Sequence, residues 1–181
     1  MTAIAAVADG TKVWIGGDSA GVGGYSLTVR ADEKVFKNGP MVFGFISSFR
    51  MGQILRYSLH VPKWDPDTDL DWFMATTFID AVRQVQKDKG FAVVDKGEET
   101  GGTFLVGFQG RLFAIYDDYQ VGSSVHGYDA VGSGGEVALG ALYASTGTPH
   151  HRVKTALMAA TEFNAAVRGP YVIVSGGTKN P

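Results

Sequence analysis

The sequence contains no cysteine among its 181 residues. This absence excludes a disulfide framework and a thiol nucleophile. It is the composition expected in a reducing cytosol, so we expect a cytoplasmic location. The chain also lacks any run of about 18 apolar residues, and its first residues lack the basic-then-apolar order of a signal peptide. We therefore expect no association with a membrane.

Neither sign of charge is in large excess. The formal net charge is −2 at pH 7 and the isoelectric point is about 6.0. The basic patch that would attract nucleic acid is missing, so no nucleic-acid partner is expected. Internal repeats, linkers and low-complexity segments are missing too. A chain of 181 residues is long enough for one domain with a substantial core, so we predict a single domain over residues 1–181.

Apolar runs separated by turn signals predict the order of the secondary structure. Asp9-Gly10 and Gln109-Gly110 are hairpin signals, each of which joins two strand-like runs. Strands are predicted at 3–8, 12–17, 25–29, 34–36, 41–46, 103–108, 112–116, 128–131 and 171–174, and helices at about 48–60, 70–87, 135–146 and 149–168. Small residues dominate the first strand, which predicts close cover on both of its faces. Strands, two helices, strands, two helices and a strand predict an α+β fold with antiparallel sheets.

Thr2 is the first candidate for chemistry. If Met1 is removed, Thr2 carries a hydroxyl and a free α-amine on one residue. An α-amine has an ordinary pKa of about 7.7–8.0, so near neutral pH a usable fraction can accept the hydroxyl proton. A weak alcohol nucleophile is activated in this way. The sequence thus permits a nucleophile and its base in direct contact.

Two charged residues support this hypothesis. Asp18 lies 16 positions after Thr2, and Lys34 lies 16 positions after Asp18. Each sits at the edge of a strand-like run. If the strands lie side by side, Lys34 can point its ammonium at the hydroxyl while Asp18 pairs with Lys34. Such a cation lowers the pKa of both the hydroxyl and the amine.

Three motifs together resemble those of proteasome β subunits and, more closely, of the bacterial HslV peptidase. They are the terminal threonine with Ile15-Gly16-Gly17-Asp18-Ser19, the Lys34-Val35 step, and Val131-Gly132-Ser133-Gly134-Gly135. Their order and spacing match over residues 2–175. The resemblance implies a four-layer αββα sandwich of two antiparallel sheets with helices on both outer faces. It also implies a threonine endopeptidase in homo-oligomeric rings of six or seven subunits, which cleaves polypeptides and has an ATPase unfoldase as a possible partner.

The resemblance also implies a role for each site residue. Thr2 is the nucleophile, Lys34 is the cation that lowers the pKa, and Asp18 orients Lys34. The hydroxyl of Ser133 lies near the terminal amine and relays or holds its proton; as a local pattern, Ser133 also fits a helix cap. No cofactor is required by this chemistry.

The oxyanion donor is less clear from the sequence. The family uses a glycine amide after the strand that corresponds to 41–46, and Ser47-Ser48 replaces that glycine pair. The backbone N–H of either serine can act as the oxyanion donor, because replacing glycine by serine leaves the N–H in place. Ile46 and Phe49 are candidates for lining an apolar specificity pocket, although core packing explains them equally well. Carbonyls of Gly169, Val172 and Ser175 have the spacing of a monovalent-cation site, such as one for sodium, in HslV.

Other functions remain open at this stage. Gly17-Asp18-Ser19-Ala20-Gly21 fits the nucleophile elbow of α/β-hydrolases, although the glycines that follow it are poor starters of a helix. Gly132-Ser133-Gly134 is no dinucleotide fingerprint, because Val137 stands where the third glycine is needed. An N-terminal nucleophile amidase for small amides would use the same constellation. A non-catalytic shell or scaffold protein that retains Met1 is the third possibility.

Overall fold

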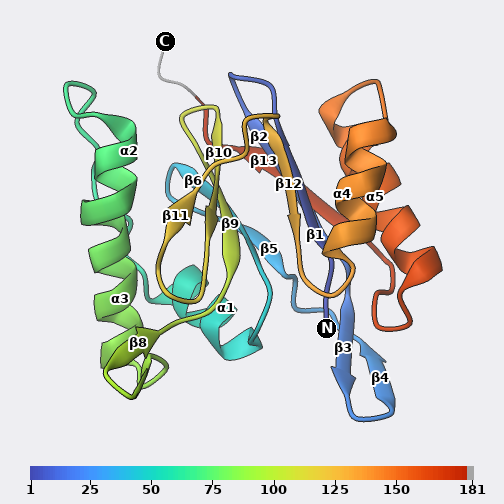
Figure 1. The fold of residues 1–181 in the computed structure, drawn as a ribbon, viewed down its shortest axis with the longest axis horizontal. Helices are drawn as coiled ribbons and strands as arrows, with labels where there is room; N and C mark the ends of the chain where they lie inside the picture. The colour runs from blue at the N-terminus through green and yellow to red at the C-terminus, as the bar shows by residue number, and fades with distance from the viewer. Residues whose placement is uncertain (179–181) are drawn as a thin grey trace.

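The computed structural model describes residues 1–178, and its two larger sheets are both antiparallel (Figure 1). The first has the strand order β12-β1-β2-β13 and the second the order β11-β10-β9-β6-β5. The strands of the first sheet are β1 (Ile4–Ala8), β2 (Val13–Gly17), β12 (Tyr128–Val131) and β13 (Val172–Gly176). Those of the second are β5 (Val35–Asn38), β6 (Met41–Phe45), β9 (Phe104–Phe108), β10 (Arg111–Ile115) and β11 (Val121–Gly122). The predicted antiparallel sheets are confirmed.

Helices lie at both outer sides of these sheets. They are α1 (Phe49–Tyr57), α2 (Leu70–Phe73), α3 (Ile79–Asp88), α4 (Gly135–Ala144) and α5 (Pro149–Phe163), with the π-helical turn η1 (Met74–Phe78) between α2 and α3. In Figure 1, α2 and α3 stand at one side, α4 and α5 at the other, and the sheets lie between them. None of the helices within residues 1–178 is long and apolar enough to cross a membrane.

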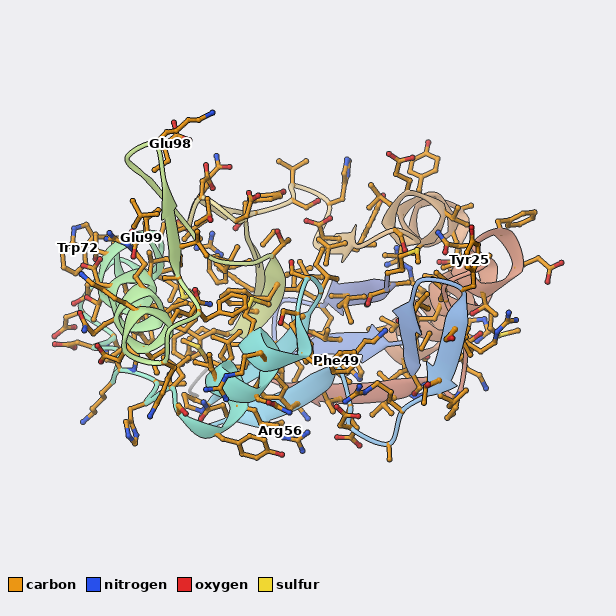
Figure 2. All side chains as sticks on the ribbon, turned by 90° about the horizontal axis from the view of Figure 1, so that it is seen from below. Tyr25, Phe49, Arg56, Trp72, Glu98 and Glu99 are labelled. Carbon is orange, nitrogen blue, oxygen red and sulfur yellow. The ribbon has the colours of Figure 1, made fainter. Side chains whose placement is uncertain are left out.

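Two small hairpins extend beyond the sheets. The first joins β3 (Ala20–Gly23) to β4 (Ser26–Val29), and the second joins β7 (Val93–Asp95) to β8 (Glu98–Thr100). Figure 2 shows Tyr25 on the first hairpin and Glu98 on the second. Sequence analysis predicted neither β3 nor the second hairpin, because glycines dominate one segment and charges the other.

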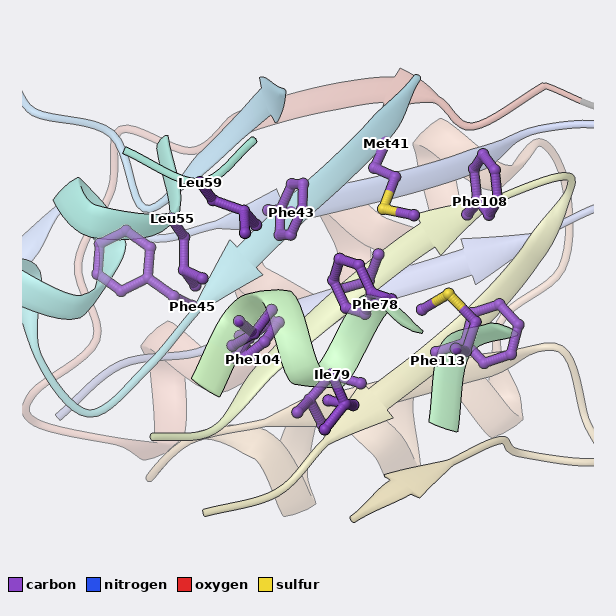
Figure 3. Close-up of a cluster of buried hydrophobic side chains, with 14 of the residues drawn as sticks. Met41, Phe43, Phe45, Leu55, Leu59, Phe78, Ile79, Phe104, Phe108 and Phe113 are labelled. Atoms are coloured by element: carbon purple, nitrogen blue, oxygen red, sulfur yellow. The ribbon is translucent and has the colours of Figure 1, made fainter. Parts of the chain in front are cut away.

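The largest hydrophobic cluster fills the space between the second sheet and helices α1 and α3 (Figure 3). Phe43 and Phe104 come from the sheet and Phe78 from η1, and all three are fully buried. Burial of an aromatic or large aliphatic side chain is worth about 1.5–3 kcal/mol. This cluster is therefore a main source of the stability that holds β6, and the loop after it, in place.

Strand β1 lies in the interior and contributes to two other clusters. Ala3 and Ala5 pack against α4 and α5, whereas Ile4 and Ala6 face the second sheet. All four residues are fully buried. The predicted close cover of the first strand is confirmed, and it places Thr2, one residue before Ala3, in a rigid setting.

Several predicted boundaries differ from the structure. Helix α5 ends at Phe163 and not at 168, because Asn164 turns the chain and donates from Nδ2 to the carbonyl of Ser133 at 2.8 Å. The predicted helix at 70–87 is divided by η1, and the predicted strand at 34–36 begins at Val35. The shift at β5 leaves Lys34 just outside the sheet.

Candidate active site

A buried ammonium connects three segments that are distant in the sequence. Nζ of Lys34 donates to Oγ1 of Thr2 at 3.0 Å and to Oδ1 of Asp18 at 2.8 Å. Thr2, Asp18 and Lys34 are 7%, 2% and 3% exposed, respectively. The site therefore holds an ion pair and a hydroxyl almost wholly out of water.

The carboxylate of Asp18 is held by the backbone as well as by Lys34. Its Oδ1 accepts from the N–H of Ala3 at 3.0 Å, and its Oδ2 accepts from the N–H groups of Ala20 at 2.9 Å and Arg168 at 3.3 Å. A carboxylate with this many donors cannot swing away from the ammonium. Asp18 thus fixes where the charge of Lys34 lies.

Burial has the largest effect on the pKa of Lys34. Desolvation lowers the pKa of its ammonium, and the hydrogen bond and charge of Asp18 act in the opposite direction. Gly17 allows the close packing beside Lys34, because a Cβ there would come within 2.9 Å of Ile4 and 3.1 Å of Val35.

The segment 132–134 contacts Thr2 from the other side. The N–H of Thr2 donates to Oγ of Ser133 at 3.1 Å, and the N–H of Gly134 donates to the carbonyl of Thr2 at 3.2 Å. Gly132 has φ +102°, and a Cβ there would clash with the carbonyl oxygen of Thr2. Only glycine fits this close approach, which sequence analysis did not predict. Ser133 does not cap α4 with its side chain, so the cap hypothesis is wrong.

The loop between β6 and α1 forms one wall of a cleft at Thr2. Ile46, Ser47, Ser48 and Phe49 all line this cleft of about 100 Å³, together with Thr2 and Lys34. The structure thus brings the predicted substrate-binding residues next to the candidate nucleophile. Most of the other lining residues are apolar.

Ser47 and Ser48 differ in the hydrogen bonds of their backbones. The N–H of Ser48 donates to the carbonyl of Ile46 at 2.9 Å, and the Ser48 side chain caps α1. Ser47 has φ +69°, a left-handed conformation that is uncommon for serine. Within residues 1–178, the N–H of Ser47 has no hydrogen-bond acceptor. Of the two amides, that of Ser47 is the one free to bind a ligand.

The opposite wall of the cleft was missed by sequence analysis. It comes from β3, where Ala20 and Val22 line the cleft. Arg30, just after β4, lies over the ring of Phe49 at 3.9 Å and is paired with Asp32 at 2.6 Å. The glycine-rich composition of residues 16–24 was the only signal, and it indicated turns and not a strand.

The nucleophile elbow is excluded by the structure. That motif needs a helix directly after its serine. Here Ser19 is followed by β3, and its Oγ donates to the carbonyl of Pro170 at 2.7 Å. Ser19 therefore has a structural role at the junction with the C-terminal segment.

Gly169 precedes β13, and Val172 and Ser175 lie three residues apart within this strand. The monovalent-cation site at their carbonyls stays a prediction. Within residues 1–178 there is also no group of three or more His, Asp or Glu side chains that could hold a metal ion.

Comparisons with known proteins agree with this architecture. No protein-family model and no curated protein matches the sequence. Among solved structures, BPH of Thiobacillus denitrificans in complex with epoxomicin matches with a TM-score of 0.80 and 19% identity, over 99% of this chain and 100% of that one.

Two further solved structures are also similar to this chain. HslV from Trypanosoma brucei matches with a TM-score of 0.68 and 19% identity, over 96% of this chain and 98% of that one. Anbu, an ancestral β-subunit from Yersinia bercovieri, matches with a TM-score of 0.66 and 19% identity, over 96% of this chain and 81% of that one. This protein therefore has the proteasome-like fold of HslV and Anbu.

Proposed function

We propose that this protein is a threonine peptidase of the N-terminal nucleophile type, with Thr2 as its nucleophile after removal of Met1. The observation that carries the proposal is the buried contact of Lys34 Nζ with Thr2 Oγ1 at 3.0 Å. A cation in this place stabilises a developing alkoxide. It also keeps the pKa of the adjacent amine low enough for the amine to act as a base.

Acylation uses both groups of Thr2. The free amine takes the proton of Oγ1, and Oγ1 attacks the carbonyl carbon of the peptide. The amine then returns this proton to the leaving nitrogen, the C–N bond breaks, and an ester remains on Oγ1. Ser133, whose Oγ lies 3.1 Å from the Thr2 nitrogen, holds and relays the proton.

Deacylation repeats the transfer with water. The amine removes a proton from a water molecule, and the resulting hydroxide attacks the ester carbon. The carboxylic acid product leaves, and Oγ1 regains its proton. One base thus serves both half-reactions without any other titratable side chain.

We assign the oxyanion role to the N–H of Ser47. It lies in the loop that walls the cleft, and within residues 1–178 no acceptor uses it. Loss of one such donor typically costs about 10²–10³ in rate. Ile46 and Phe49 line the same cleft and favour an apolar substrate side chain.

Removal of Met1 is the condition on which the mechanism depends. The side chain and backbone of Met1 are 64% exposed, so an aminopeptidase can reach them. With Met1 present, the nitrogen of Thr2 is an amide and Oγ1 donates to the Met1 carbonyl at 2.6 Å. A chain that retains Met1 would be a shell or scaffold protein.

The assembly is part of the same proposal. The two sheets between outer helices fit a four-layer αββα sandwich, and the likeness to HslV and Anbu supports homo-oligomeric rings. A location in the cytoplasm, an ATPase unfoldase as partner and a bound monovalent cation stay predictions.

A labelling experiment tests the proposal. Epoxomicin is bound in the structure of BPH, and we expect it to add its mass once to each processed chain of this protein. The Thr2→Ala variant should stay unlabelled. Fluorogenic peptides compared with small amides then separate a peptidase from an amidase. Absence of labelling and of hydrolysis in a chain that begins with Thr2 would refute the proposal.

A further inference from the structure

The ring of Phe49 lies between two cavities. Phe45 and Phe49 line both the cleft at Thr2, of about 100 Å³, and a second cavity of about 60 Å³. The second cavity lies between α1 and the segment that carries Asp32 and Glu33. The two phenylalanine rings pack edge to face, with their centroids 5.8 Å apart. This aromatic pair thus forms a partition between the candidate active site and an adjacent space.

The two rings of the partition are not held equally well. Phe45 is 4% exposed, and a Cβ on Gly52 of α1 would clash with its ring. Glycine at this helical position therefore lets the Phe45 ring lie directly against the helix. Phe49 is only partly buried, and Figure 2 shows it at the end of α1 nearest the β3–β4 hairpin. Its ring depends on a contact from outside the helix.

Arg30 supplies this contact from the opposite wall of the cleft. Its guanidinium carbon lies 3.9 Å from the centroid of the Phe49 ring. Nε and Nη2 of Arg30 donate to the two carboxylate oxygens of Asp32 at 2.7 and 2.6 Å, which fixes the plane of the guanidinium. The methylene stem lies against Gly21, where a Cβ would come within 2.6 Å of Cδ of Arg30. A cation held in this way over an aromatic face stabilises the position of the ring.

The volume of the cleft limits the side chains that can enter it. An apolar cavity of about 150 Å³ holds one benzene ring. The cleft at Thr2 is smaller, at about 100 Å³, whereas the two cavities together exceed the volume that a benzene ring needs. An aliphatic side chain therefore fits while the Phe49 ring stays in place. An aromatic side chain requires the ring to move.

We propose that Arg30 is a positioning residue, which holds the Phe49 ring across the cleft and thereby restricts the site to aliphatic side chains of the substrate. Arg30 is not among the residues that line the cleft, so it acts through Phe49. This inference rests on the proposed function for the class of ligand, a peptide. It adds a selection against aromatic side chains and names the residue pair that enforces it.

Peptide binding tests the selection without catalysis. The Thr2→Ala chain without Met1 is titrated with two labelled peptides that end in leucine or phenylalanine, and fluorescence anisotropy follows binding. We expect the leucine peptide to bind about 10-fold more tightly or better. Arg30→Met, which frees the Phe49 ring, should reduce this preference by about 2- to 10-fold, and Arg30→Lys, which keeps a cation, should restore most of it. Phe49→Ala joins the two cavities and should reverse the preference.

Arg111→Met is the matched control in the same background. Arg111 pairs with Asp71 at 2.7 Å and lies 5.0 Å from the centroid of the Phe113 ring. Its side chain is 40% exposed, against 38% for Arg30. It lines neither of the two cavities, so its loss should leave the preference unchanged. Circular dichroism of each variant checks that the fold is retained.

Hydrogen exchange gives a second readout of the contact. Arg30→Met should raise the exchange rates of the amides of residues 46–52 by about 2- to 10-fold, and Arg111→Met should not. Equal affinity for the two peptides, no binding of either, or a full preference retained in Arg30→Met would overturn the proposal. Both readouts proceed without hydrolysis, so a protein with the expected preference but without peptidase activity would refute only the proposed function.

Discussion

Nζ of Lys34 lies 3.0 Å from the hydroxyl oxygen of Thr2, although 31 residues separate the two in the chain. Both side chains are buried, and the carboxylate of Asp18 holds the ammonium from the other side at 2.8 Å. A charge in this place has little structural use that an apolar side chain could not supply, because buried ion pairs contribute little net stability. It is well placed to activate the hydroxyl.

Substitutions at Thr2 distinguish the role of its hydroxyl in hydrolysis from its contribution to stability. Thr2→Ala removes Oγ1 and should abolish peptide hydrolysis, whereas Thr2→Ser keeps a hydroxyl and should retain measurable activity. Both variants should stay folded, and Thr2→Ala, which leaves Nζ of Lys34 with one hydrogen-bond acceptor fewer, should lower the unfolding midpoint more than Thr2→Ser. Hydrolysis of a fluorogenic peptide and urea denaturation measure the two effects. Full activity in Thr2→Ala would remove Thr2 from the mechanism.

Lys34 should make stability depend on pH in the alkaline range. Burial lowers the pKa of Lys34 in the folded chain below its ordinary value of 10.5. Between this lowered pKa and about 10.5, the unfolded chain binds more protons than the folded one, so the contribution of Lys34 to the free energy of unfolding rises with pH. Lys34→Met lacks this titration. The stability of the wild type relative to Lys34→Met should therefore increase from neutral pH toward 10.5.

Denaturant unfolding of both proteins at several pH values measures this difference. Groups common to the two chains, such as the tyrosines, cancel in the comparison. A difference that stays constant, or that falls as the pH rises, would show that burial does not lower the pKa of Lys34.

Asp18 should matter far more for stability than an exposed carboxylate. Asp18→Asn removes one partner of a buried ion pair, and loss of such a partner costs about 3–5 kcal/mol. Asp32→Asn is the matched control, because Asp32 pairs with Arg30 at 2.6 Å and its side chain is 44% exposed. An exposed pair is worth about 0–1 kcal/mol. Equal losses in the two variants, measured by urea denaturation, would contradict the central place of Asp18.

Substitutions at Ser47 test the left-handed backbone conformation of the proposed oxyanion loop. Its φ of +69° suits glycine, and the left-handed conformation costs other residues about 1–2 kcal/mol. Ser47→Gly and Ser47→Ala both lose the hydrogen bond that Oγ accepts from the N–H of Thr103 at 3.2 Å. Ser47→Gly should therefore be more stable than Ser47→Ala by about 1–2 kcal/mol. Both should retain hydrolysis, since the N–H remains.

An equal free energy of unfolding in the two Ser47 variants would indicate that the loop relaxes to another conformation. Loss of hydrolysis in both variants, with the stability maintained, would assign a role to the hydroxyl and not to the amide. The same two measurements, unfolding and peptide hydrolysis, distinguish these cases.

Much of the fold was predictable because local signals agree with the tertiary structure. The turn at Asp9-Gly10 pairs β1 with β2, and Gln109-Gly110 pairs β9 with β10, as expected. The end of α5 was not predictable, because Asn164 ends the helix through a contact with Ser133 that lies 31 residues away. The β3–β4 hairpin was missed in part because its glycines give no strand signal.

The site was predictable only in part for a similar reason. Resemblance identified Thr2, Asp18, Lys34 and Ser133, but no local pattern could bring Ser133 to the nitrogen of Thr2 across 131 residues. The choice between the two serine amides depends on the hydrogen bond from Ser48 to the Ile46 carbonyl, which only the folded loop reveals. The wall formed by Ala20 and Val22 likewise depends on the unexpected strand β3.

N-terminal sequencing of the purified, assembled protein, supported by its intact mass, tests the central claim most directly. The mechanism requires a free amine on the residue that carries the hydroxyl, so we predict that the mature chain begins with Thr2 and that its mass is lower by one methionine. A chain that begins with Met1 in an assembly that hydrolyses peptides would contradict the account, because Thr2 would then have an amide and no base.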